Sequence, residues 1–150
     1  MIKQKKNNKS LTRFVSVQTL YCLHYDNDLL DENNFFLNDK YFNFFSDFEN
    51  KIEKKEFDEI FSKELLTKYK ENKILIDDLI KKNLSTNWDI KRLPILLYSI
   101  LSIAISEMII NPKTPVGVII TEYLNLTNCF FFDDEFAFVN ALLEKIYKNL

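Results

Sequence analysis

The chain has 150 residues, enough for one domain with a hydrophobic core but few for two. Hydrophobic residues make up 47% of it, with 14 Phe and 7 Tyr, which excludes a disordered chain, and the net charge of −2 excludes a polycation. One Gly and three Pro are too few for the turns of a β-sandwich or a doubly wound fold, so an all-α fold is favoured.

The N-terminus is locally basic. No acidic residue occurs from Met1 to Phe14, and the basic residues there are Lys3, Lys5, Lys6, Lys9 and Arg13. Such an arm indicates either contact with a polyanion or a solvated terminus. Apolar residues at helical spacing then predict a first helix from about Ser10, as its N-cap, to Tyr25.

Two more helices are predicted in the middle of the chain. Residues 33 to about 48 form a very aromatic segment that is typical of a short helix packed in a core. From Phe57 to about Leu84, apolar residues recur every three or four positions and polar residues fill the positions between them. This pattern predicts one long amphipathic helix that bridges two halves of the protein.

Three helices are predicted in the last third. A single turn at Trp88–Arg92 precedes a helix over Pro94–Ile110, which is apolar on every side and should be central. That segment is too short, and too rich in Ser and Glu, to span a membrane. Thr114 is the predicted cap of the next helix, and Asp133 or Asp134 the predicted cap of the last.

We therefore expect one domain over residues 1–150. It consists of an N-terminal helical subdomain over residues 1–84, which includes the basic arm, and a C-terminal helical subdomain over residues 85–150.

No catalytic set is recognisable, so the chain is predicted to be a binding protein without a cofactor. The single Gly117 excludes a Gly-rich phosphate loop, and the single His24 leaves no hydrolase triad. Cys22 and Cys129 lack metal-ligand spacing and predict a reduced, cytoplasmic protein. The acidic run Asp133–Glu135 could attract a cation, but acidic residues in a turn are more typical of helix caps.

Two acids, Glu107 and Glu122, lie inside apolar helices. Buried carboxylates need partners, so a structural role is favoured over catalysis. Arg92 and Lys113 are the candidate partners.

Several motifs of the last third, in this order and spacing, resemble the family of the transcription antitermination factor NusB. They are Trp88–Arg92, Ile100–Leu101, Ser106–Met108, Pro115–Glu122 and Phe138–Ile146. The first helix, with Lys9, Arg13 and the run Val17-Gln18-Thr19-Leu20-Tyr21, resembles the basic first helix of the same family. Residues 26–84 match in helical character only.

The resemblance implies an all-α bundle of about seven helices in two subdomains. It implies binding of the boxA segment of ribosomal RNA leader transcripts together with ribosomal protein S10 (NusE), in a complex with RNA polymerase that suppresses premature termination. It also implies that the protein is neither an enzyme nor bound to a membrane or metal.

Carried over position by position, the resemblance implies two groups of site residues. The RNA-binding group consists of Lys5, Lys6, Lys9, Arg13, Gln18, Tyr21 and Phe138. The partner-binding group at the S10 surface consists of Asp134 and Glu135. Cations would hold the RNA backbone while aromatic rings stack on unpaired bases. Tyr21 could equally belong to the core.

The chain departs from the family pattern at Ser102, Ser106, Thr121 and Ala141. Ser102 stands where the family has an arginine, an expected internal partner for Glu107 or Glu122. Two alternatives therefore stay open. One is the helical domain of a ribosomal RNA cytosine methyltransferase, against which we note that no cofactor-binding domain follows Leu150. The other is an interaction protein that has kept the fold and weakened its RNA binding.

Overall fold

The structure is a computed structural model that describes residues 9–25, 58–85 and 87–150. Within these residues it is all helical, as predicted. The elements are α1 (Lys9–Leu23), α3 (Glu59–Glu71), α4 (Lys73–Asn83), a 3-10 helix η2 (Ile90–Arg92), α5 (Ile95–Ile110), α6 (Val116–Phe130) and α7 (Asp133–Lys148). The helix predicted over residues 33–48, and Lys5 and Lys6 of the basic arm, lie outside the described residues.

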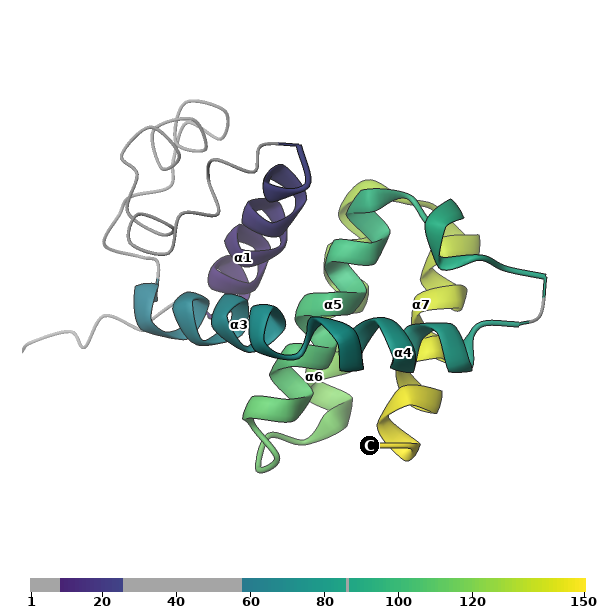
Figure 1. Ribbon diagram of the computed structural model, residues 1–150. Helices are drawn as coiled ribbons and strands as arrows, with labels where there is room; N and C mark the ends of the chain where they lie inside the picture. The colour runs from purple at the N-terminus through teal and green to yellow at the C-terminus, as the bar shows by residue number, and fades with distance from the viewer. Residues whose placement is uncertain (1–8, 26–57, 86) are drawn as a thin grey trace, which may run out of the picture.

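Helix α5 is the centre of the bundle, as its uniformly apolar sequence predicts. It packs against α1, α3, α4, α6 and α7 (Figure 1). Every residue from Leu97 to Met108 is buried, including three serines and Glu107. Among the described helices, none has the length and apolar content to cross a membrane.

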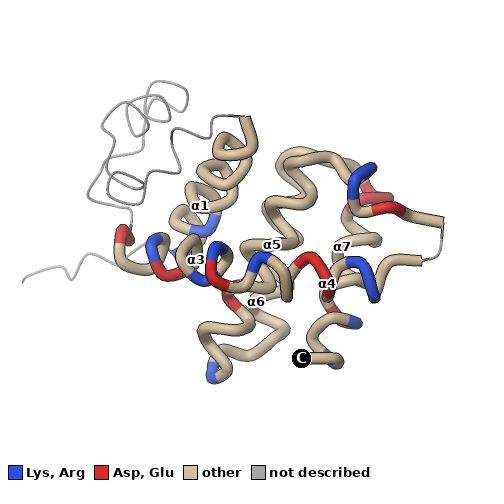
Figure 2. The backbone as a smooth tube through the Cα atoms, in the orientation of Figure 1, with Lys and Arg blue, Asp and Glu red and all other residues tan. Residues whose placement is uncertain are grey.

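The prediction of one long helix from Phe57 to Leu84 is wrong in one respect, because Asn72 divides this segment into α3 and α4. The Asn72 side-chain amide donates to the carbonyl of Lys68, and its backbone leaves helical geometry at φ −116° and ψ 19°. The two helices run end to end across α5, with acidic and basic residues alternating along them (Figures 1 and 2). Asp58 caps α3 by accepting from the Phe61 amide.

Three predicted helix caps are also wrong. Ser10 lies inside α1, and its hydroxyl donates to Glu122 instead. Thr114 precedes the N-cap of α6, which is Pro115 and makes no side-chain cap bond. At α7 the carboxylate of Glu135, rather than Asp133 or Asp134, accepts the amide of the N-cap Phe132. Asp133 and Asp134 lie in the first turn, where the helix dipole still favours negative charge.

Candidate nucleic-acid interface

Helix α1 packs against α3, α5 and α6. Its buried face packs on α3 and α5, because Val17, Leu20 and Leu23 follow one another at helical spacing and are at most 4% exposed. On the same side, the hydroxyls of Ser16 and Ser62 lie 2.7 Å apart and connect α1 to α3.

Of the cations predicted to bind phosphate, Lys9 is exposed at the start of α1. Its Nζ lies 4.7 Å from the centre of the Phe61 ring, an arrangement in which the ring face attracts the cation. This contact places the Lys9 charge at the end of α1 that continues into the basic arm.

Arg13 has a different environment from the one predicted for a phosphate contact. Its side chain is only 7% exposed, and its guanidinium forms a fork on the Glu107 carboxylate with N–O distances of 3.1, 2.9 and 2.7 Å. A second carboxylate, that of Glu122, lies 3.6 Å from Nη1. The structure therefore corrects the prediction for Arg13: its charge is used inside the protein and does not face a ligand.

The same geometry identifies the partners of the two acids. Glu107 is 1% exposed and accepts from Arg13 and, at 2.7 Å, from the Tyr123 hydroxyl, so it is the structural buried acid that was predicted. Glu122 is 28% exposed, so its predicted burial is wrong, and it accepts from Ser10 at 2.9 Å. The predicted partners Arg92 and Lys113 are both exposed, and Arg13 takes their place.

Electrostatics in this cluster favour the charged guanidinium of Arg13 and the neutral phenol of Tyr123. Burial acts to lower the pKa of Arg13, but the hydrogen bonds and negative charge of Glu107 outweigh burial, and the pKa is raised. Burial, and then the charge of Glu107, raise the pKa of Tyr123 well above its usual value. Tyr123 therefore remains a hydrogen-bond donor to Glu107 throughout the physiological range.

Further along α1, Gln18 and Tyr21 are half-buried. The Tyr21 ring contacts the Tyr25 ring edge to face, with 5.2 Å between centroids. Tyr21 is half-buried, so stacking on RNA and packing in the protein both stay predictions for it.

Phe138, Asp134 and Glu135 all lie on α7. Phe138 is half-buried, and its ring lies 5.8 Å from the ring of Trp88, which is 53% exposed. Asp134 is exposed, whereas the Glu135 carboxylate is used in the helix cap. This end of the bundle and the start of α1 are thus two separate groups of predicted site residues.

A second polar cluster fixes the end of α1 to the bend between α3 and α4. The Tyr98 hydroxyl donates to Asp77, lies 3.0 Å from the Tyr69 hydroxyl, and its ring contacts the His24 ring. Lys73 pairs with Asp77 at 2.8 Å. Burial lowers the pKa of His24, with a smaller contribution from the Lys73 charge. Nothing in the sequence pattern indicated this cluster.

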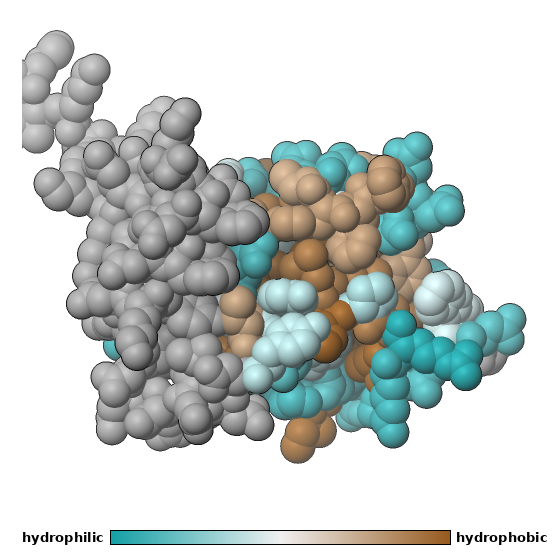
Figure 3. All heavy atoms as spheres, turned by 90° about the horizontal axis from the view of Figure 1, so that it is seen from above, coloured by the Kyte–Doolittle hydropathy of each residue, from teal (hydrophilic) through white to brown (hydrophobic). Residues whose placement is uncertain are grey.

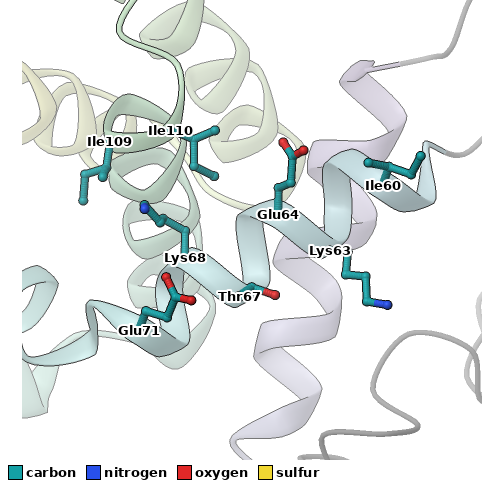
Figure 4. Close-up of a pocket in the computed structure, with 8 residues that line it drawn as sticks. All are labelled: Ile60, Lys63, Glu64, Thr67, Lys68, Glu71, Ile109 and Ile110. Atoms are coloured by element: carbon teal, nitrogen blue, oxygen red, sulfur yellow. The ribbon is translucent and has the colours of Figure 1, made fainter.

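An open groove of about 490 Å³ lies between α3 and the end of α5 (Figure 4). Four charged residues line it, two of each sign, together with Thr67 and three isoleucines: Lys63, Lys68, Glu64, Glu71, Ile60, Ile109 and Ile110. Charges of both signs that alternate along an exposed helix face are typical of a solvated surface. The groove lacks a paired nucleophile and base, so we do not assign catalysis to it.

Ser10 and Tyr123 are parts of the Arg13 cluster that the sequence reading did not include. Ser10 lies three residues before Arg13, and Tyr123 directly follows Glu122. The helical spacing of Ser10 and Arg13 could have signalled a shared face.

Within the described residues, the fold and the site define an all-helical binding domain with a cationic end on its first helix. Comparison with known proteins then identifies the family. Residues 10–148 match the NusB family, and the chain belongs to it.

Relatives in two bacteria show how far the similarity extends. The chain is 31% identical over 157 aligned residues to the transcription antitermination protein NusB of Rickettsia massiliae (strain Mtu5), with 99% of this chain and 97% of the relative covered. It is 37% identical over 95 residues to the same protein of Caldicellulosiruptor saccharolyticus, with 63% of this chain and 72% of the relative covered.

Two solved structures share the fold. T. maritima NusB superposes with a TM-score of 0.73 at 24% identity, covering 95% of this chain and 92% of that one. NusB from a crystal structure of NusB and NusE in complex with dsRNA gives a TM-score of 0.69 at 23% identity, covering 95% and 97%.

Proposed function

We propose that this chain is a transcription antitermination factor that binds boxA-type single-stranded RNA together with ribosomal protein S10 (NusE). The observation that carries the proposal is the match along almost the whole chain to proteins named for antitermination. A solved structure of the same fold is described as NusB and NusE in complex with dsRNA, which supports NusE and RNA as classes of partner. The factor joins the RNA polymerase complex, has no catalytic step of its own and acts in the cytoplasm.

The RNA contacts begin at the N-terminal end of α1. Lys9 is exposed there, and Lys5 and Lys6 precede it in the sequence. With Arg13 engaged inside the protein, three lysines remain as phosphate contacts. Gln18 and Tyr21 extend the RNA contact surface along α1. On α7, Phe138 adds an RNA contact, and Asp134 and Glu135 contact S10.

The way in which α1 is fixed to the bundle suits the binding of RNA. A buried ion pair and two serines fix α1 to the rest of the bundle, so its exposed end forms a rigid surface. A rigid surface reduces the ordering cost of binding a flexible RNA strand, and S10 adds a second point of attachment.

The test is an anisotropy titration of labelled boxA RNA, with and without S10. We expect binding that tightens when S10 is present and that is lost when Lys5, Lys6 and Lys9 are each replaced by Glu. The matched control replaces three exposed lysines elsewhere, Lys81, Lys145 and Lys148, by Glu, and should bind normally. Failure to bind RNA even with S10 would refute the proposal.

A second candidate function, interaction with S10 without RNA, is favoured by one observation. Arg13, a predicted phosphate contact, is buried. The two candidates predict different results. An interaction protein would bind S10, and its RNA titration would be the same for the parent and for the Lys-to-Glu variant.

A further inference from the structure

The aromatic pair at the far end of the bundle presents the ring of Trp88 outward and that of Phe138 inward. Trp88 is 53% exposed, whereas Phe138 is half-buried and packs against the core. The two ring centroids lie 5.8 Å apart with 34° between the ring planes, so Phe138 packs against the ring of Trp88. A ligand that approaches this surface meets the indole first.

Two cations follow Trp88 in the chain, after Asp89 and Ile90. Lys91 and Arg92 form the end of η2, and both are exposed. The nearby Asp89 carboxylate accepts from the Lys91 amide and is used in capping this turn. The capped turn therefore sets the backbone positions of two exposed cations three and four residues after Trp88.

The surroundings restrict what could bind here. Hydrophobic residues gather on the end of the bundle seen in Figure 3, with hydrophilic residues around them. Asp133 and Asp134 begin α7 and repel phosphate, which leaves Lys91 and Arg92 as the groups that can hold a backbone. An exposed aromatic ring beside fixed cations is the arrangement with which proteins bind single-stranded nucleic acid.

We propose that Trp88 stacks on an unpaired RNA base and that Lys91 and Arg92 hold the adjacent phosphates. This site rests on the proposed function and adds residues to it: Trp88 takes the stacking role that the sequence reading assigned to Phe138.

The chain provides its own probe, because Trp88 is its single tryptophan. Unlabelled boxA RNA should quench tryptophan emission with the same midpoint as the anisotropy change of labelled RNA. Replacing Trp88 by Ala should weaken RNA binding about fivefold to a hundredfold, the range expected for loss of one base stack. Trp88→Phe keeps a flat ring and should restore most of the affinity, which separates stacking from a loss of folding. Lys91→Gln and Arg92→Gln should each reduce the salt slope of binding by about 0.7.

Matched controls are Tyr147→Ala and Lys148→Gln, which change an exposed aromatic residue and an exposed cation at the C-terminal end of α7. The inference would be overturned if RNA bound by anisotropy without quenching Trp88 emission and if Trp88→Ala bound RNA with the affinity of the parent. That result would leave the proposed function intact. A change in emission with S10 alone and none with RNA would overturn it in favour of a protein contact. No RNA binding at all would overturn both.

Discussion

The buried pair of Arg13 and Glu107 allows a stability prediction with a definite size. Arg13→Met keeps most of the side-chain volume but leaves the Glu107 carboxylate, 1% exposed, with Tyr123 as its remaining hydrogen-bond donor. Leaving one charge of a buried ion pair without its partner costs about 3–5 kcal/mol. Glu107→Gln should cost less, about 1–3 kcal/mol, because the amide oxygen still accepts from Tyr123 and Glu122 still lies near Arg13.

The double variant Arg13→Met/Glu107→Gln is the decisive one. It contains no unpaired buried charge, so it should be at least about 1 kcal/mol more stable than Arg13→Met alone. Urea denaturation, followed by circular dichroism, measures the free energy of unfolding of all four proteins. The control is Lys73→Met, which breaks an ion pair whose lysine is 56% exposed and should cost less than about 1 kcal/mol.

Additive costs in the double variant, or a cost for Arg13→Met below that of Lys73→Met, would refute the reasoning. RNA binding gives a second check. Because Arg13 does not face the ligand, Arg13→Met should leave the salt slope of RNA binding unchanged, whereas Lys9→Gln should reduce it by about 0.7.

Three further predictions concern single side chains. The Ser102 hydroxyl is buried without a hydrogen-bond partner among the described residues, so Ser102→Ala should stabilise the fold by up to about 1 kcal/mol in urea denaturation. Ser106→Ala, which removes a hydroxyl bonded to the Ser102 carbonyl, should not stabilise it, and equal effects of the two changes would contradict the argument. The pKa of Tyr123 is raised, so its contribution is complete below the usual phenol pKa of about 10 and is lost as the pH rises above it. Above that pH, the melting temperature of the parent should fall more steeply with pH than that of Tyr123→Phe. Parallel curves of melting temperature against pH would count against this prediction. The pKa of His24 is lowered by burial, so its contribution is complete above about pH 6.5 and declines as the pH falls through that range. His24→Gln should therefore reduce the fall of the melting temperature at acidic pH. An equally steep fall in this variant would exclude His24 as the cause.

Local periodicity was enough to predict most of the helices. The segment that forms α5 is apolar on all sides, and only a central position could bury it. The break at Asn72 was not predictable in the same way, because a single Asn is tolerated inside a helix. The preference for ending α3 there depends on how α3 and α4 pack on α5, which is a property of the folded chain.

The site was less predictable than the fold. Arg13 and Glu107 are 94 residues apart in sequence, and a rule based on spacing cannot pair them. As a cation within a basic run, Arg13 looked like part of the ligand-binding arm, and only its burial shows the internal role. The proposed role of Trp88 could not be inferred from the sequence for a similar reason, because its exposure and its contact with Phe138 arise from the tertiary structure.

The salt dependence of boxA RNA binding in the presence of S10 tests the central claim most directly. With Lys5, Lys6 and Lys9 as the phosphate contacts of the arm, these three contribute about −2 to the slope of log affinity against log salt. Replacing all three by Gln should remove that contribution, while the same number of changes at Lys81, Lys145 and Lys148 should leave the slope as it was. RNA binding with an unchanged slope in the triple arm variant, or no RNA binding by the parent with S10, would contradict the account.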